Sequence, residues 1–169
     1  MSGVVPFYVY NISSLQIISL VENQLNGTLP ASIGFTLPNL QIHVSGGNEF
    51  SGKIPISFCN ASQLQSLDLS VNNFFGSVPN NLGNLPDLYR MDLSNNNLGR
   101  GWDFLTSLTN CSKLEVVDLN TNQFRCFAQF YSQLVKPTHC IVFRIQRYIW
   151  SYSCIIRESC QLYYLGYAL

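Results

Sequence analysis

The sequence predicts an α/β solenoid: a right-handed arc of about five coils with a parallel β-sheet on its concave side, followed by an irregular, non-repeat tail. Three observations predict this fold. A nine-residue pattern of the form LxxLxLxxN occurs five times, its copies are 24 to 26 residues apart, and a shorter string with glycine and proline follows the first three copies. A near-constant period of this length indicates stacked units, each of which buries its apolar side against the next.

Each copy of the pattern is expected to form one short strand of the sheet. The five copies are Leu15–Asn23, Leu40–Asn48, Leu64–Asn72, Leu88–Asn96 and Leu114–Asn122. Alternate residues of a strand point to the same side, so the spaced leucines enter the core and the residues between them face outward. At the turn after the strand, an asparagine amide can bond backbone groups that would otherwise be buried without a partner. The expected structural asparagine ladder consists of Asn23, Asn48, Asn72, Asn96 and Asn122.

A second string follows the asparagine in three copies and places a proline three residues after a glycine. It occupies Leu25–Pro30, Phe50–Pro55 and Phe74–Pro79, and Gly3–Pro6 resembles its end from a preceding repeat. The glycine permits a tight turn, and the proline favours an extended segment outside the hydrogen-bonded sheet. The residues after each proline, such as Asn80–Leu85, are expected to make turns or short helices on the convex side.

The second repeat departs from the pattern. Its inward places hold His43 and Ser45, whereas Ile42 and Val44 fall at outward places. A slip of one residue exchanges the two faces of a strand, so either the register is locally irregular or the repeat is weakened. No ligand cluster accompanies His43, and neither it nor His139 lies in an HExxH or nucleophile-elbow motif. We therefore expect no catalytic residue, no metal ligand and no cofactor.

The combination of LxxLxLxxN with LxGxIP is typical of plant-type leucine-rich repeats. Residues 1–124 resemble the extracellular region of plant leucine-rich-repeat receptor-like serine/threonine kinases. Three segments resemble the subgroup that includes receptors for bacterial patterns: Tyr10–Leu15, Ile33–Leu40, and the longer Leu98–Leu114, in which a short insert and a helical turn replace GxIP. The chain is thus similar to a fragment of such an ectodomain that starts and ends within a repeat.

This resemblance implies a receptor with an ectodomain, one membrane span and a cytoplasmic kinase, located at the extracellular face of the plasma membrane. It also implies a peptide or protein ligand, a co-receptor, and a role in defence or development. The glycine-rich loop, HRD and DFG motifs of a kinase do not occur in these 169 residues, so we do not expect an enzyme. The first residues lack a basic stretch followed by an apolar run, so we expect no signal peptide in this chain.

A ligand of such a scaffold is expected on the concave face. The outward places there hold Ser19, Val21, Glu22, Ser66, Asp68, Ser70, Arg90, Asp92, Ser94, Asp118 and Asn120. These side chains are mixed and small, without the aromatic anchor that dominates many binding hot spots. The three aspartates recur at one place of the repeat, about 4.8 Å apart per coil, which predicts a solvated acidic stripe. Contact with a polar or basic ligand is the alternative for this stripe.

Four asparagines lie in N-x-S/T sequons, which accept N-linked glycans in secreted proteins. They are Asn11, Asn26, Asn60 and Asn110. Their presence in the repeat region fits an extracellular location of the parent protein. Asn60 and Asn110 are also placed to cap the turn before the next strand.

Charge is unevenly distributed along the chain, although the formal net charge is zero and favours no nucleic-acid partner. Residues 1–124 hold eight acidic and four basic side chains, whereas residues 125–169 hold one acidic and five basic. The second part also holds 10 of the 22 aromatic residues and four of the six cysteines, and the leucine spacing ends at Phe124. We therefore expect repeats over 1–124 and a poorly ordered or non-native tail over 125–169.

Three interpretations of this tail compete. A membrane anchor is disfavoured because its best window, Cys140–Ile156, is shorter than a membrane span and contains Arg144 and Arg147. The second is a C-terminal cap stapled by cysteines, for which the chain offers Cys126, Cys140, Cys154 and Cys160. Composition favours the third, a sequence foreign to the repeats that arises from readthrough or mis-splicing of a truncated gene.

The leading functional hypothesis is a fragment of a receptor-kinase ectodomain that binds a peptide or protein. The alternative is a truncated product without independent function, or a soluble decoy-type repeat protein. A gene that continues in frame past Phe124 with further repeats, a membrane span and a kinase would favour the first hypothesis.

Overall fold

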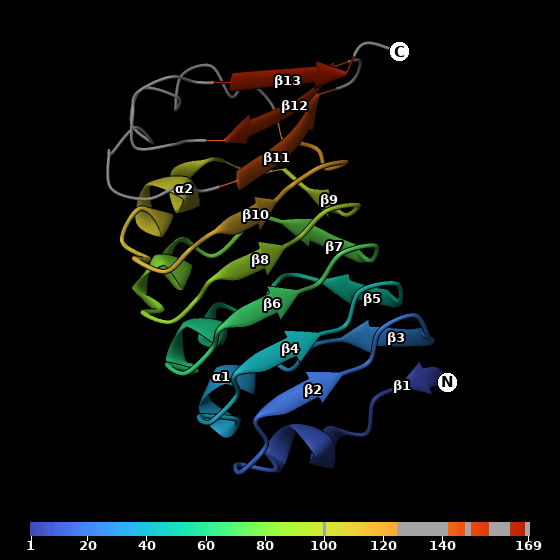
Figure 1. Ribbon diagram of the computed structural model, residues 1–169. Coiled ribbons are helices and arrows are strands. Elements are labelled where there is room, and N and C mark those ends of the chain that lie inside the picture. Colours follow the sequence, from blue (N-terminus) through green and yellow to red (C-terminus); the bar gives the residue numbers. More distant parts are fainter. Residues whose placement is uncertain (100, 125–141, 148–149, 156–162, 168–169) are drawn as a thin grey trace.

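The computed structural model describes residues 1–99, 101–124, 142–147, 150–155 and 163–167, the last three ranges by their backbone alone. Residues 1–124 wind into stacked coils (Figure 1). A typical coil contributes one strand to a concave parallel sheet, one strand to a second parallel sheet, and a short helix. The predicted α/β solenoid with a parallel concave sheet is therefore confirmed.

The nine-residue pattern forms the concave sheet. Its strands are β2 (Ile17–Ser19), β4 (Ile42–Val44), β6 (Ser66–Asp68), β8 (Arg90–Asp92) and β10 (Val116–Asp118), and neighbours in this order pair in parallel. The middle residue of each strand points into the core. Leu67, Met91 and Val117 are completely buried there, as alternation along a strand requires.

The second repeat keeps this register. His43 lies opposite Ile18 on one side and opposite Leu67 on the other, so a local irregularity of the register is ruled out. The repeat is weakened instead, because polar side chains fill two core places: His43 and Ser45 are both 0% exposed.

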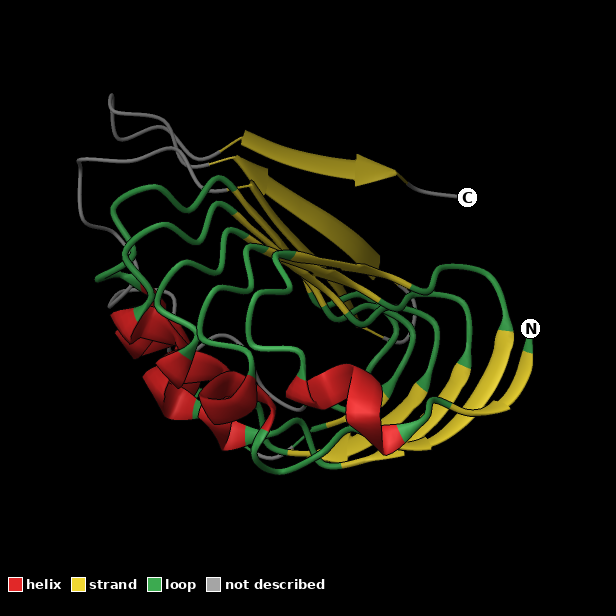
Figure 2. Cartoon of the chain, turned by 90° about the horizontal axis from the view of Figure 1, so that it is seen from below, coloured by secondary structure: helices red, strands yellow, loops and turns green. Residues whose placement is uncertain are grey.

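The string with glycine forms the second parallel sheet, which the repeat pattern did not predict. Its strands are β1 (Ser2–Val4), β3 (Gln24–Thr28), β5 (Glu49–Gly52), β7 (Asn73–Gly76) and β9 (Asn97–Leu98). Gly27, Gly52 and Gly76 have φ angles of 91°, 92° and 90°, which only glycine adopts without strain. The prolines of the string follow these strands and lie outside the sheet, as expected. Seen along the stack, the two sheets and the row of helices form three sides of the coils (Figure 2).

Short helices form the convex side, as expected for the residues after each proline and for the helical turn of the longer segment Leu98–Leu114, which contains the last of these helices. They are η1 (Phe7–Asn11), α1 (Ile33–Thr36), η2 (Ile56–Asn60), η3 (Asn80–Asn84) and α2 (Asp103–Leu108). Their apolar side chains turn into the core, where Ile33, Phe58 and Leu82 are 0% exposed. One continuous hydrophobic core therefore runs through all the coils.

The asparagine after each concave strand bonds its own coil to the coil before it. The Oδ1 atom of Asn72 accepts a hydrogen bond from the Phe50 amide at 2.9 Å. Its Nδ2 atom donates to the carbonyl groups of Ser45, Leu69 and Ser70 at 3.0, 3.3 and 2.9 Å. Asn48, Asn96 and Asn122 make the same set of bonds, and Asn23 bonds the Met1 amino group and two carbonyls.

The described part of the tail forms three strands, although it keeps no leucine spacing. These are β11 (Val142–Arg147), β12 (Trp150–Ile155) and β13 (Tyr163–Tyr167). The first pairs in parallel with β10 and the others follow antiparallel, so the concave sheet reaches eight strands. Aromatic and β-branched residues favour extended backbone, which accounts for strands in a segment expected to be irregular. The boundary after residue 124 stays a prediction.

Several residues considered above lie outside the described ranges. They are Cys126, His139, Cys140 and Cys160. The window weighed as a membrane anchor falls largely on β11 and β12. Among the described residues, the helices are too short and too polar to cross a bilayer.

His43 is a titratable group buried in the core without a hydrogen bond. Its ring lies edge-on to Phe58, with 5.3 Å between ring centroids, and neither ring nitrogen has a partner among the described residues. Burial lowers the pKa of His43 from 6.5 to about 4, and the Asp68 carboxylate opposes this shift with a smaller effect. The folded chain therefore keeps a neutral imidazole at pH values where the unfolded chain is protonated.

We expect His43 to make the fold sensitive to acid. Between pH 6.5 and pH 4 the unfolded chain binds a proton that the folded chain rejects, so stability is complete above this window and falls within it. The loss reaches about 3 kcal/mol at pH 4, since one pKa unit corresponds to about 1.4 kcal/mol. The variant His43→Leu, which restores the apolar side chain of the other coils, should lose this component. Urea unfolding at pH 7, 5.5 and 4 measures it, and an identical pH dependence of both proteins would contradict the prediction.

Candidate binding face

The acidic stripe lies on the concave face, but it is not freely solvated. Asp92 and Asp118 are only 9% and 7% exposed, and Asp68 is half-buried. Each carboxylate accepts a hydrogen bond from the backbone amide two residues later, at 3.0 Å in Asp68–Ser70, 3.2 Å in Asp92–Ser94 and 3.0 Å in Asp118–Asn120. The two serine hydroxyls add bonds of 2.7 Å. The expectation of a solvated stripe is therefore wrong, because these carboxylates hold the turns that end the strands.

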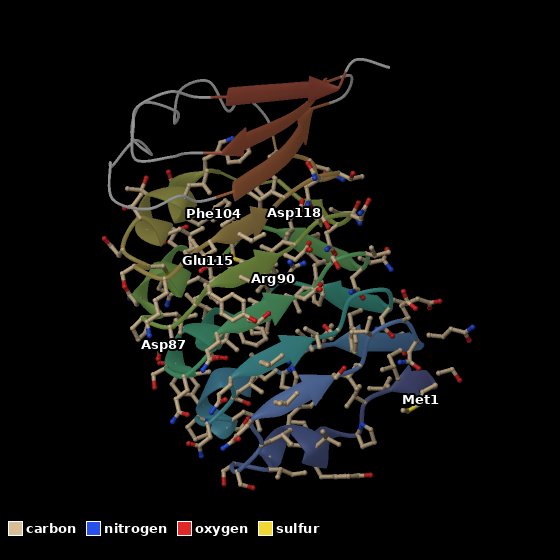
Figure 3. All side chains as sticks on the ribbon, in the orientation of Figure 1. Met1, Asp87, Arg90, Phe104, Glu115 and Asp118 are labelled. Atoms are coloured by element: carbon tan, nitrogen blue, oxygen red, sulfur yellow. The ribbon has the colours of Figure 1, made fainter. Side chains whose placement is uncertain are left out.

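Arg90 lies at the centre of the face. Its guanidinium donates to the second carboxylate oxygen of Asp92 at 3.0 Å, and its side chain is 41% exposed. On the strand ladder Arg90 lies between Ser66 and Val116. Figure 3 shows Arg90 and Asp118 on the concave strands. The centre of the face thus carries a positive charge that is already paired but still accessible.

The remaining predicted face residues divide by exposure. Ser19, Val21 and Glu22 are exposed, Ser70 and Asn120 are half-buried, and Ser66 and Ser94 are buried. Only part of the outward places therefore offers surface to a ligand.

A depression lies at the side of the concave sheet where the chain enters the strands. The outward positions of the repeat pattern did not predict it. It has a volume of about 520 Å³ and is lined by Gln65, Asp87, Tyr89, Lys113 and Glu115. Gln65, Tyr89 and Glu115 occupy the second position of the nine-residue pattern in three successive coils. Asp87 and Lys113 come directly before the first leucine of the pattern in the coils of β8 and β10. In Figure 3, Asp87 and Glu115 lie toward the helical side of the face, away from Asp118.

Tyr89 is the residue that could have indicated this depression. It is the only aromatic residue in the five copies of the nine-residue pattern, and its side chain is 39% exposed. The expectation that the face lacks an aromatic anchor considered the third, fifth and seventh positions of the pattern, together with Glu22 at the eighth, but not the second position. The second place also reaches solvent, because it lies at the bend that leads into the strand.

The chain offers little chemistry beyond binding in its described part. Among those residues no group of three or more histidine, cysteine or acidic side chains is arranged to hold a metal ion. Burial raises the pKa of Cys111 to about 11 and also raises the pKa of Cys59, so neither thiol is an activated thiolate at neutral pH.

The four sequon asparagines are exposed and lie outside the concave strands. Asn11 and Asn60 end η1 and η2, Asn110 follows α2, and Asn26 lies in β3. The Asn60 amide donates to the Ser57 carbonyl of its own helix at 3.1 Å.

Comparisons with known proteins show what these coils are similar to. A family model for leucine-rich repeats matches residues 63–85. Receptor-like protein 31 of Arabidopsis thaliana is 32% identical over 68 residues, which make up 40% of this chain and 8% of that protein. A TDR receptor structure is 34% identical with a TM-score of 0.68, covering 73% of this chain and 21% of the receptor. The plant peptide hormone receptor RGFR1 in complex with RGF2 is 27% identical with a TM-score of 0.58, covering 73% and 23%.

The coils are thus a leucine-rich-repeat arc similar to plant receptor ectodomains. The chain spans less than a quarter of each of these three relatives.

Proposed function

We propose that the chain is a ligand-binding leucine-rich-repeat scaffold from a plant receptor ectodomain, and that its concave face recognises an extended peptide or a segment of a protein. The observation that carries this proposal is the hydrogen-bonded order of a concave surface with mixed polar and apolar side chains. Its strands are bonded from coil to coil, and the aspartates hold their own turns. A surface that is already ordered loses little conformational entropy when a ligand binds.

Two further observations support the proposal. RGFR1, which is similar in fold, is a peptide hormone receptor in complex with RGF2. All four sequons are exposed on the helices, on the turn after α2 or on the second sheet, so glycans attached there would leave the concave strands free. We infer that Asn11, Asn26, Asn60 and Asn110 carry glycans and that the scaffold faces the outside of the cell.

The finer part of the proposal concerns the parent protein. We infer a receptor-like serine/threonine kinase of the subgroup that includes receptors for bacterial patterns, with a co-receptor and a role in defence or development. The gene should then continue in frame after Phe124 with further repeats, a membrane span and a kinase. A transcript across the junction of Phe124 and Arg125 that instead encodes the present tail and ends there would favour a truncated or decoy-type product, as the change of charge at this junction does.

The binding proposal is testable by peptide selection. Random twelve-residue peptides are displayed and selected against the full chain, and the affinities of the selected peptides are measured by titration calorimetry. Arg90→Trp places a bulky side chain at the centre of the concave face and should weaken binding at least about tenfold, which corresponds to about 1.4 kcal/mol.

Thr106→Trp provides the matched control, because Thr106 is exposed on α2 at the convex side. It should change the affinities less than about twofold. Selected peptides that tolerate Arg90→Trp but lose affinity with Thr106→Trp would refute a concave ligand site.

A further inference from the structure

The depression beside the concave sheet has a fixed backbone frame. The Gln65 carbonyl accepts hydrogen bonds from the amides of Tyr89 and Arg90 at 2.9 and 3.2 Å. The Tyr89 carbonyl accepts from the amides of Glu115 and Val116 at 2.9 and 3.1 Å. These backbone groups are therefore already hydrogen-bonded within the fold. A ligand in the depression would be recognised mainly by the side chains, which project from this hydrogen-bonded backbone.

The side chains of the depression differ in how their charges are paired. The Lys113 ammonium donates to the Asp87 carboxylate, which compensates both charges. The Glu115 carboxylate is exposed and forms no ion pair or hydrogen bond within the described part of the chain. The depression thus presents one uncompensated negative charge.

The surroundings are negative as well. Within residues 1–124, the concave face and its edge carry six acidic side chains, namely Glu22, Asp68, Asp87, Asp92, Glu115 and Asp118, and two basic ones. Both basic side chains, Arg90 and Lys113, are already paired with carboxylates. Strand β11, which extends the sheet beyond β10, adds Arg144 and Arg147 to the sequence of the sheet. The part of this surface formed by residues 1–124, which includes the depression, therefore attracts cationic ligands and repels anionic ones.

Tyr89 adds an accessible aromatic side chain to the negative charge of Glu115. The two residues occupy the same position of the pattern in neighbouring coils. An aromatic face attracts a cation, and a planar guanidinium can stack on the ring while it donates two parallel hydrogen bonds to a carboxylate. We propose that the depression formed by Gln65, Tyr89 and Glu115 binds an arginine side chain of an extended basic peptide. This inference deepens the proposed function and rests on it.

The dimensions of the depression fit such a ligand. Its row crosses three coils, and neighbouring coils in a parallel sheet are about 4.8 Å apart, so the row spans roughly 10 Å. An extended peptide advances about 3.3 Å per residue, so about three residues cover this distance. One outward-pointing arginine can therefore enter the depression while the residues on either side of it cross the flanking coils.

In the test, the full chain is titrated with the acetylated, amidated peptide Gly-Ser-Arg-Ser-Gly. Binding is measured from the NMR signals of the tyrosine rings and the backbone amides. We expect the signals of Tyr89 and Glu115 to shift, and the peptide with glutamine in place of arginine to bind at least about fivefold more weakly. Glu115→Gln and Tyr89→Leu should each weaken the arginine peptide about three- to tenfold.

Glu49→Gln is the matched control, because it removes the same charge from an exposed glutamate of β5 in the second sheet. It should change the affinity less than about twofold. Equal weakening by Glu49→Gln and Glu115→Gln would overturn the inference, since attraction would then be due to overall charge. Equal binding of the glutamine and arginine peptides would overturn it as well.

The peptides selected for the concave face separate this inference from the proposed function. If they lose affinity with Arg90→Trp, contain no arginine and tolerate Glu115→Gln, the arginine site is refuted and the scaffold function stands. If they contain arginine and weaken with Glu115→Gln, the site is supported. If neither selected nor arginine peptides bind the concave face, both proposals fail.

Discussion

Gly34→Ala is expected to destabilise the repeat region by about 4 kcal/mol or more, or to prevent folding. Gly34 lies in α1 against η2, where its amide donates to the Ser57 hydroxyl at 3.1 Å. A Cβ atom at this position would overlap the carbonyl oxygen of Ser57, which belongs to the backbone of the next coil and cannot rotate away. The coils would have to separate, and every contact between these two helices would loosen.

Thermal and urea unfolding monitored by circular dichroism measure this effect. Phe35→Ala is the matched control, because Phe35 is the next residue of the same helix and is 67% exposed. It should change the stability by about 0.5 kcal/mol or less. Gly83 of η3 meets the Ser107 carbonyl of α2 in the same way two coils later, so Gly83→Ala should repeat the result. A Gly34→Ala variant that unfolds at the same urea concentration as Phe35→Ala would contradict the close approach of the coils.

Asn72→Ala is expected to destabilise the fold by about 3 to 4 kcal/mol, since a buried donor or acceptor left without a partner costs about 1 to 3 kcal/mol. The change removes the acceptor of the Phe50 amide and the donor shared by the carbonyls of Ser45, Leu69 and Ser70. Asn72 is 8% exposed, so water has poor access to the freed groups. Asparagine cannot be replaced by aspartate here without losing the amide donor.

Asn73→Ala serves as the control, because Asn73 is the next residue in sequence and is exposed. It should alter the free energy of unfolding by about 0.5 kcal/mol or less. Hydrogen exchange adds a local readout: in Asn72→Ala the Phe50 amide should exchange faster than in the control. Unchanged protection of this amide would mean that the asparagine bond is not what holds the turn.

The repeat pattern of the sequence predicted much of the fold, but it predicted only part of the candidate binding site. The places of Leu67, Met91 and Val117 in the core follow from alternation within three-residue strands. The row of Gln65, Tyr89 and Glu115 stands at the bend before each strand, where neither the period of a strand nor that of a helix assigns a direction. Asp87 and Lys113 lie 26 residues apart in sequence, and only the stacking of coils brings them into contact.

The second sheet was missed for a similar reason. Gln24–Thr28 contains a single apolar side chain, Leu25, which is too little alternation to identify a strand. Its backbone becomes extended because the preceding and following coils supply hydrogen-bond partners. The strands of the tail likewise depend on β10 as an edge to pair with.

By itself, the sequence determined the repeat, its period, the inward leucines and the asparagine at each turn, because these follow from the periodicity of a strand and from the hydrogen-bonding capacity of one side chain. Only the tertiary structure decided which outward side chains reach solvent. Asp92 and Asp118 fill an outward place yet are almost buried, whereas Tyr89 and Glu115 reach solvent from a place that alternation does not define. The physical reason is that exposure depends on the neighbouring coils, which lie about 24 residues away in sequence but about 4.8 Å away in space.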